Sequence, residues 1–282
     1  MWQLGARTPG PPPSAIVVQK EPVEPPSLFV GLPRPLRTSA PVIWDIDDAV
    51  WIGRRGAHAM AVKMCRRSDV VVAGNELLAA WARSHGAHSI VIPTCCPPPA
   101  LSDGDDSPRA SDQIHLLWIG SPATSRLLTA FGPVLDELFA RLPQLRARFV
   151  GGRPPVELRG NPSVEFVEWS PDAELAALRW AHYGLALQDR SEYNDHKCGF
   201  KVVQYMSAGV VPIVSDGPVH RDIVGHLGLL LDATPDLGSM TERLRRPPEE
   251  REVAEVVSRW ESGYSLAHAV ELWSSLLAEI VR

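Results

Sequence analysis

The chain has few cysteines, and they follow no pattern that would pair them. Only four occur among its 282 residues. None is spaced as Cys-x-x-Cys, and Cys95 and Cys96 are adjacent. This excludes a disulfide framework and a zinc knuckle, and it favours a reducing, cytoplasmic location. A cluster of histidines and cysteines with metal-ligand spacing is also missing, which is consistent with a protein that uses no metal and no cofactor.

A positive charge excess and long apolar runs are missing as well. The formal net charge of −5 argues against nucleic acid as a partner. No apolar run approaches the roughly 18 residues that a membrane span needs. The Gly/Pro-rich residues 1–14 lack the apolar core of a secretory signal. Peripheral contact with the inner face of a membrane stays compatible with these absences.

The chain does contain a regular alternation of apolar, β-branched runs with segments of helical spacing. Near-continuously apolar strands that alternate with helices predict an α/β fold with parallel sheets covered on both faces. The predicted strands are residues 15–19, 41–46, 69–73, 89–92, 115–120, 148–152, 164–167, 183–187 and 211–215. The predicted helices are residues 57–67, 76–84, 127–142 with a kink at Gly132-Pro133, 170–180 and 265–281.

One segment breaks this alternation. Residues 94–112 contain three consecutive prolines and several aspartates with serine and glycine between them, which is the composition of a linker. The α/β alternation resumes after it. We therefore predict two α/β domains, over residues 1–95 and 114–264, joined by a linker over 96–113 and followed by a final helix over 265–282.

Acidic residues follow the strand at 41–46. Carboxylates at the carboxyl end of a parallel strand lie where such sheets bind ligands. In one interpretation Asp45 and Asp47 resemble the nucleophile and acid of haloacid-dehalogenase-type phosphatases, although Ala49 stands where that family usually has threonine. In the other, Asp47 and Asp48 only cap the loop and the next helix.

Two further loops follow predicted strands. Asn75 either caps the helix after it or faces a ligand. In Gly120-Ser121-Pro122-Ala123-Thr124, Ser121 is the expected N-cap and Pro122 the first helical residue. Such a helix start binds anions through free backbone N–H groups, and the hydroxyls of Ser121 and Thr124 would add donors. A plain strand-to-helix connection would look much the same.

The segment 196–209 follows a buried strand and passes through a glycine into a helix. Lys197 and Lys201 are four residues apart and Gln204 is three further on, so at helical spacing they share a face. This face suits a ligand with a phosphate end and a polar end. A solvated helix start with a lysine pair is the alternative. Gly209 is the expected C-cap.

Taken together and in this order, these segments resemble the GT-B glycosyltransferases of the retaining family-4 type. The resemblance covers about residues 15–281. It is carried by Asp-Ile-Asp-Asp-Ala-x-Trp (45–51), Asp-x-Val-x-Ala-Gly-Asn-Glu-x-Leu-Ala (69–79), Ile-Pro-Thr (92–94), Trp-Ile-Gly-Ser-Pro-Ala-Thr (118–124), Glu-Trp-Ser (168–170) and Lys-Cys-Gly-Phe-Lys-x-x-Gln-Tyr-Met-x-Ala-Gly (197–209).

The resemblance implies two Rossmann-like domains that face a cleft, with the final helix packing back on the first domain. The implied activity is transfer of a sugar from a nucleotide-diphosphate donor to a glycan, lipid or small-molecule acceptor, without a metal. Lys201 and the turn at Gly120, Ser121 and Thr124 would bind the diphosphate, and Lys197 would assist. Gln204 stands where the family often has a glutamate that bonds the ribose.

The other site residues are assigned by the same resemblance. His196 falls at the position of the first glutamate of the family's Glu-x7-Glu motif, and we count it with the catalytic residues. Asp47 and Asp48 would be catalytic residues near the acceptor, and Asn75 would lie on the acceptor side. Retention of configuration is likewise implied only by the family.

The chain departs from the family at its start. Only a Pro-rich stretch precedes the strand at 15–19, where the family has several strands, so we expect an incomplete, N-terminally truncated first domain. Two alternatives to an active glycosyltransferase follow. One is a non-catalytic remnant that binds nucleotide sugars, and the other is the phosphatase that uses Asp45 and Asp47.

Overall fold

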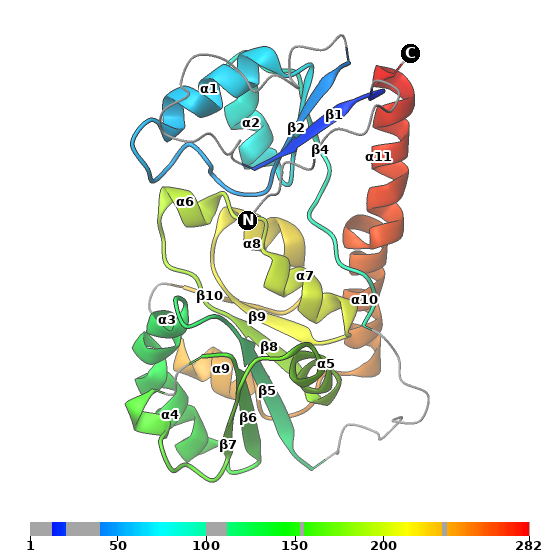
Figure 1. Cartoon of the computed structure of the whole chain (residues 1–282). Helices are drawn as coiled ribbons and strands as arrows, with labels where there is room; N and C mark the ends of the chain where they lie inside the picture. Colours follow the sequence, from blue (N-terminus) through cyan, green and yellow to red (C-terminus); the bar gives the residue numbers. More distant parts are fainter. Residues whose placement is uncertain (1–12, 21–39, 100–111, 153–154, 233–235, 282) are drawn as a thin grey trace. The chain divides into compact units, whose positions relative to one another are not determined.

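The computed structural model describes residues 13–20, 40–99, 112–152, 155–232 and 236–281. The chain divides into two compact units, each an α/β assembly (Figure 1). The first unit comprises residues 1–92 and 270–282, and the second comprises residues 93–269. Residues 100–111, the middle of the predicted linker, lie outside the described part of the chain.

The first unit is built on a four-stranded parallel sheet of order β1-β2-β3-β4. Its strands are nearly continuous apolar runs; β3 is buried at every position. The strands are β1 (Ile16–Gln19), β2 (Val42–Ile46), β3 (Val70–Ala73) and β4 (Ser89–Val91), and the helices between them are α1 (Ala57–Arg67) and α2 (Glu76–Ser84). All six elements confirm the sequence prediction to within a residue.

The second unit has a six-stranded parallel sheet of order β10-β9-β8-β5-β6-β7. The strands are β5 (Ile114–Ile119), β6 (Leu145–Val150), β7 (Val164–Val167), β8 (Tyr183–Ala186), β9 (Val211–Ser215) and β10 (Leu229–Leu231). The helices are α3 (Ser125–Ala130), α4 (Gly132–Arg141), a 3-10 turn η2 (Val156–Leu158), α5 (Pro171–Trp180), α6 (Glu192–Asp195), α7 (Phe200–Ser207), α8 (Pro218–Val224), α9 (Leu237–Arg243) and α10 (Glu250–Tyr264). The last helix, α11 (Leu266–Ile280), begins in this unit and ends in the first.

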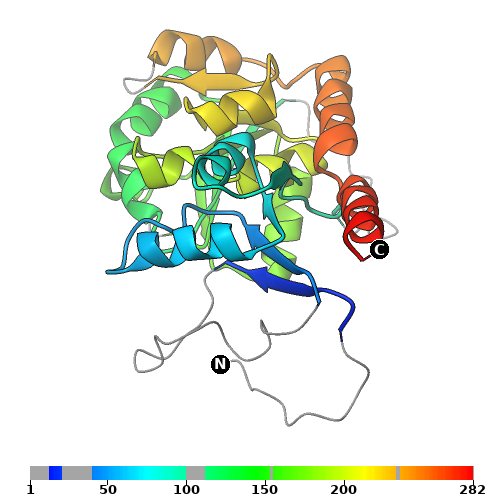
Figure 2. The same cartoon turned by 90° about the horizontal axis from the view of Figure 1, so that it is seen from above.

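Helices α5 and α7 cover one face of the second sheet. They bury Leu178 and Tyr205 in a cluster that includes Leu117, Ile119 and Val150 of the strands. Helix α10 packs on α7, and α4 contacts α9 (Figures 1 and 2). The sheet therefore has the layered α/β arrangement that the alternation of strands and helices predicts.

The strand order reverses between β5 and β8, which makes this the topological switch point of the second sheet. The two strands pair only at Leu116 with Tyr183 and Leu117 with Gly184. Beyond that point the hydroxyl of Tyr205, from α7, accepts a hydrogen bond from Ile119 N (3.1 Å) and donates one to Leu185 O (3.2 Å). In sheets of this kind ligands bind outside the carboxyl ends at the switch point.

Two helix ends that matter for the site agree with the sequence to within a residue. Helix α5 begins at Pro171, and Ser170 caps it by accepting a hydrogen bond from Ala173 N. Helix α7 ends at Ser207 with Ala208 as its C-cap, one residue before the expected Gly209, which follows with φ +65°. The N–H groups of Gly209 and Val210 bond back to the helix, the two bonds of a Schellman motif. The two caps define the first residue of α5 and the end of α7, the two helices that carry the polar residues of the site.

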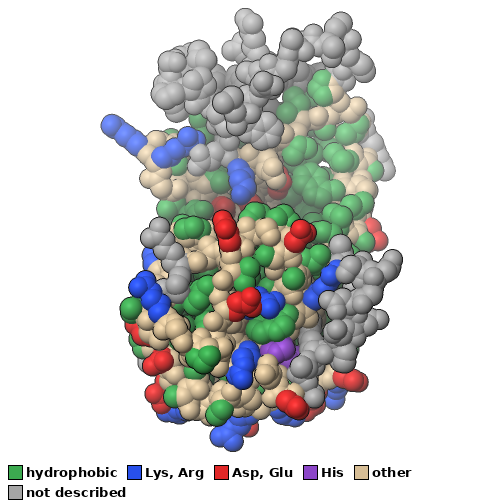
Figure 3. Space-filling model, turned by 60° about the horizontal axis from the view of Figure 1, so that its bottom comes forward, with side chains coloured by type: hydrophobic (Ala, Val, Ile, Leu, Met, Phe, Trp, Pro, Cys, Tyr) green, Lys and Arg blue, Asp and Glu red, His purple; other side chains and the backbone are tan. Residues whose placement is uncertain are grey.

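On the face seen in Figure 3, basic and acidic side chains are interspersed, and neither charge forms a large patch of its own. Within the described ranges, no helix combines the length and the apolar character that crossing a membrane requires.

Candidate functional site

Two glycine turns form the carboxyl edge of the second sheet. Gly120 follows β5 and Gly151 follows β6, and Gly120 N donates to Val150 O (3.0 Å). A Cβ at Gly120 would lie 2.3 Å from the Trp118 ring, and one at Gly151 would lie 2.5 Å from Gly120 O. The turns are packed too closely for side chains, so the sheet edge here is backbone.

The turn after β5 differs from the prediction. Helix α3 begins at Ser125 and Thr124 occupies the N-cap position, so the prediction of Ser121 as N-cap and Pro122 as first helical residue is wrong. The reason is that Thr124 Oγ1 accepts from Ser121 N and donates to Ser121 O, both at 3.0 Å, which closes a separate turn before the helix. The proton of the Thr124 hydroxyl is therefore engaged within the turn.

Helix α7 brings together only two of the three polar residues expected on its face. Gly199 adopts φ +60° and starts the helix, so Lys197 lies before it, with its ammonium 5.1 Å from the centre of the Tyr193 ring. The prediction that Lys197 shares the helical face is wrong for this reason. Lys201 and Gln204 do share it, with Nζ donating to Oε1 at 3.1 Å.

Glu174, in the first turn of α5, joins this pair. Its carboxylate accepts hydrogen bonds from Gln204 Nε2 (2.6 Å) and from Lys201 Nζ (3.2 Å). Trp169 Nε1 donates to the same carboxylate at 2.8 Å. Burial opposes ionisation of Glu174, but the bond from Trp169 and the charge of Lys201 outweigh it and lower its pKa. The sequence analysis missed Glu174, although the cap at Ser170 places it in the first turn of a helix.

Trp169 connects this cluster to the glycine turns. The residue is 53% exposed, and its Cβ lies 3.1 Å from the position a Cβ at Gly151 would take. The carboxyl edge of the second sheet thus presents an ammonium group, an amide, a carboxylate and an exposed aromatic face. These groups suit a ligand with phosphate, hydroxyl groups and a planar ring.

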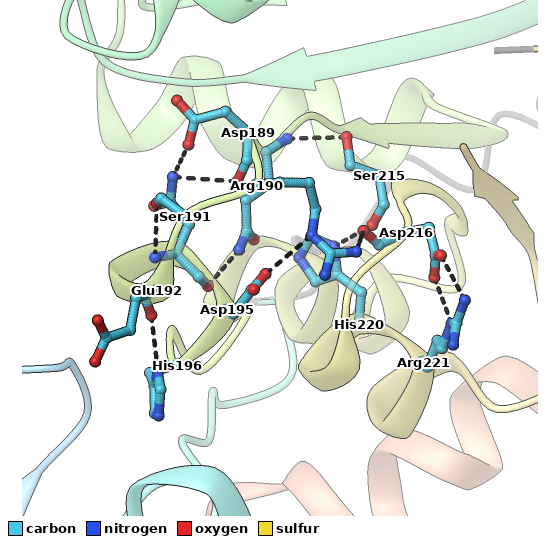
Figure 4. Close-up of polar contacts among 12 residues, drawn as sticks. Asp189, Arg190, Ser191, Glu192, Asp195, His196, Ser215, Asp216, His220 and Arg221 are labelled. Atoms are coloured by element: carbon cyan, nitrogen blue, oxygen red, sulfur yellow. Dashed lines mark hydrogen bonds and ion pairs between the residues drawn. The ribbon is translucent and has the colours of Figure 1, made fainter. Parts of the chain in front are cut away.

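The loop after β8 carries His196 and is held by its own polar contacts (Figure 4). Asp189 accepts from Asn194 and pairs with Arg126 of α3. Ser191 caps the short helix α6, and His196 Nδ1 lies 2.7 Å from Glu192 O. His196 sits at the end of this segment, away from the Ser215–Arg221 contacts in the same view, and its catalytic role stays a prediction.

A separate cavity of about 260 Å³ lies where β8, β9 and β10 end. Its walls include Phe131, between α3 and α4, and Gln188, Arg190, Ser215 and Asp216. None of the residues predicted to bind the donor lines it. The cluster of Glu174, Lys201 and Gln204 is therefore a different site from this cavity.

In the first unit the structure brings the predicted carboxylates together with a lysine. Lys20 Nζ lies 3.0 Å from Asp47 Oδ2 and 3.7 Å from Asp48 Oδ2. Burial lowers the pKa of Lys20, but the hydrogen bond and charge of Asp47 outweigh it and raise that pKa. One oxygen of Asp47 is buried without a hydrogen-bond partner in the described ranges. Sequence reasoning missed Lys20, although it directly follows the strand at 15–19.

Asp45 faces the same group of charges. Burial and, next to it, the charge of Asp47 raise the pKa of Asp45 to about 6, against the hydrogen bond from Gln19 and the charge of Lys20. The folded protein therefore binds more protons here than the unfolded chain between about pH 4 and 6. The stability that Asp45 contributes is fully present below that window and is lost as the pH rises through about 6.

We expect Asp45→Asn to raise the free energy of unfolding above pH 6 by about 1–2 kcal/mol, because the amide carries no charge to desolvate. The gain should shrink towards zero as the pH falls to about 4. Urea unfolding from pH 4 to pH 8 measures this, with Glu279→Gln, an exposed carboxylate of the same unit, as control. A gain that is independent of pH would contradict the role given to Asp45.

The structure confirms one of the two interpretations of Asn75, that it caps the helix after it. It is 6% exposed, and its Oδ1 accepts from Leu78 N at 3.0 Å, so it caps α2. Capping accounts for the residue at this position. Over the described residues as a whole, no group of three or more His, Cys, Asp or Glu side chains is arranged to hold a metal ion.

Comparisons by sequence identify no relative: no protein-family model and no curated protein matches the chain. Comparison of the fold with solved structures does find similar proteins. The chain is similar to the pneumococcal O-GlcNAc transferase GtfA, solved in complex with UDP and GlcNAc, with a TM-score of 0.61 and 12% identity over 86% of this chain and 53% of GtfA.

Two other solved structures are similar to the same extent. TarM of S. aureus, solved with Fondaparinux, alpha-GlcNAc-glycerol and UDP, matches with a TM-score of 0.62 and 10% identity over 84% of this chain and 51% of TarM. The alpha,alpha-trehalose 6-phosphate synthase of Burkholderia multivorans matches with a TM-score of 0.62 and 12% identity over 86% and 67%. The fold is that of the GT-B glycosyltransferases, and the chain spans about half the length of GtfA and TarM.

Proposed function

We propose that the chain takes part in glycosyl transfer from a nucleotide-diphosphate sugar, and that its second unit binds the donor. The observation that carries this proposal is the cluster of Lys201, Gln204 and Glu174, which α5 and α7 place beside the switch point of the second sheet. A GT-B fold supports it, since two similar structures contain UDP.

The roles within the donor site follow from the chemistry of each group. The Lys201 ammonium stabilises the negative charge that the diphosphate gains as the sugar departs. Gly120 has no side chain of its own, so its backbone would be the part of the turn that meets the phosphates. Gln204 bonds hydroxyl groups of the nucleoside. Lys197, just before α7, adds a second positive charge.

The first unit would bind the acceptor. Asp47 and Asp48 lie together at the carboxyl end of β2, with Lys20 between them. A carboxylate there can accept a proton from an acceptor hydroxyl. Asn75, the N-cap of α2, would lie on the same acceptor side. The acceptor would be a glycan, a lipid or a small molecule, and by the family resemblance the transfer would retain configuration, with His196 among the catalytic residues.

An assay of donor cleavage tests the proposal. The purified chain is incubated with UDP-, GDP- and ADP-sugars, with and without glycan and lipid acceptors, and release of nucleoside diphosphate is measured. We expect release from one nucleotide class, reduced in Asp47→Asn and Asp48→Asn. Binding without release would favour the non-catalytic remnant. Neither binding nor release, together with a Mg²⁺-dependent phosphatase activity that Asp45→Asn abolishes, would overturn the proposal.

A further inference from the structure

Glu174 is the point where the polar contacts of the donor site meet. Its carboxylate accepts three hydrogen bonds, from Trp169, Lys201 and Gln204. These donors come from the β7–α5 loop and from α7, so the carboxylate ties two separate elements together. Its side chain is only 17% exposed, and its contacts lower its pKa despite this burial, which favours the ionised form.

The contacts fix the direction in which the amide of Gln204 points. Nε2 donates to Glu174 Oε1 at 2.6 Å, so Oε1 is turned towards Lys201 and accepts from Nζ at 3.1 Å. Without the carboxylate, the two ends of the amide could exchange places. Glu174 therefore determines which end of Gln204 faces a ligand.

The same contacts leave Lys201 with capacity for a ligand. An ammonium group has three N–H donors. Two of them are used, by Glu174 and Gln204, which holds a long and otherwise mobile side chain in one geometry. The ammonium also lies 5.8 Å from the centre of the Phe200 ring, but within the described ranges no hydrogen bond takes its third N–H, which is left for an oxygen of the diphosphate.

We propose that Glu174 is the positioning residue of the donor site, which sets the Lys201 ammonium and the Gln204 amide in place before the nucleotide binds. This inference rests on the proposed function, because it assumes a nucleoside diphosphate as ligand. It predicts that one of the residues 174 and 204 must carry a carboxylate and the other an amide. Which of the two residues carries which group should matter little.

An exchange of the two side chains tests this. Glu174→Gln removes the carboxylate, and we expect the Kd of the nucleoside diphosphate that wild type binds best to rise about tenfold. Gln204→Glu places two carboxylates against each other, so they share a proton and affinity should weaken as the pH rises. The double variant restores one carboxylate and one amide, and its affinity should return to within about threefold of wild type.

Asp172→Asn is the matched control, because it removes an exposed carboxylate from the same turn of α5. It should leave the affinity unchanged. Each variant is checked by thermal unfolding, so that a loss of fold is not mistaken for a loss of binding. A purely structural role for Glu174 would give neither the pH dependence of Gln204→Glu nor the recovery of affinity in the double variant.

Two failures are distinguishable. If wild type binds none of UDP, GDP and ADP, the proposed function is contradicted. If wild type binds one of them, but folded Glu174→Gln binds it equally well, only the role of Glu174 is overturned. A double variant as weak as the two single effects combined would also overturn it, since it would show that the two side chains act independently.

Discussion

Replacing Lys201 by alanine is expected to weaken the binding of a nucleoside diphosphate by roughly 1.5–3 kcal/mol, which is about a 10- to 150-fold rise in Kd. The variant removes the only ammonium on the polar face of α7 and with it a charge-assisted hydrogen bond to phosphate. It also leaves Glu174 with an uncompensated charge facing the ligand. Calorimetric titration with the diphosphate that wild type binds best measures the change.

Lys63→Ala is the control for this variant. Lys63 lies on α1 in the first unit, so its replacement lowers the net charge by the same amount without touching the donor site. Its affinity should match wild type. Raising the salt concentration should weaken binding by wild type more than binding by Lys201→Ala, because the variant lacks the charge that salt screens. Unchanged affinity in a correctly folded Lys201→Ala would refute the role of Lys201 in the donor site.

The second large effect is expected at Tyr205, and it concerns stability. Tyr205 is fully buried, and its hydroxyl bonds Ile119 N and Leu185 O where β5 and β8 stop pairing. Its ring also fills the space beside Gly184, where a Cβ would lie 2.4 Å from the ring. Tyr205→Ala should therefore lower the free energy of unfolding by about 3–5 kcal/mol, through the cavity and the two lost bonds.

Tyr205→Phe separates the two contributions. It keeps the ring but leaves Ile119 N and Leu185 O unpaired in the core, which should cost about 1–3 kcal/mol. Denaturant unfolding measures both variants, with Tyr264→Phe as control, because the Tyr264 hydroxyl makes no hydrogen bond to the described residues. If Tyr205→Phe were as stable as wild type, the hydroxyl would not be what joins the two strands.

The core of the fold could be predicted from the sequence because its strands are short apolar runs with no competing interpretation. Strands β5, β8 and β9 are buried at almost every position, as parallel strands covered on both faces must be. Helix α10 was not predicted, although it has fifteen residues. Val253, Val256, Val257 and Trp260 recur at helical spacing, so the periodicity of the sequence could have identified it.

The site was predictable only where contacts are local. Lys201 and Gln204 are three residues apart on one helix, and they do meet. Lys197 was misplaced because the left-handed conformation of Gly199 starts the helix two residues after it, which spacing alone cannot show. Glu174 was missed because it reaches Gln204 across 30 residues and from another helix. Such a contact depends on how α5 and α7 pack on the sheet.

The central claim is that the second unit holds a nucleoside diphosphate at the cluster of Lys201, Gln204 and Glu174. Calorimetric titration of the wild-type chain with UDP, GDP and ADP tests it most directly. We predict binding of one of the three at a single site, with an affinity that Lys201→Ala reduces and Lys63→Ala does not. Absence of binding for all three, or binding that Lys201→Ala leaves intact, would contradict the claim.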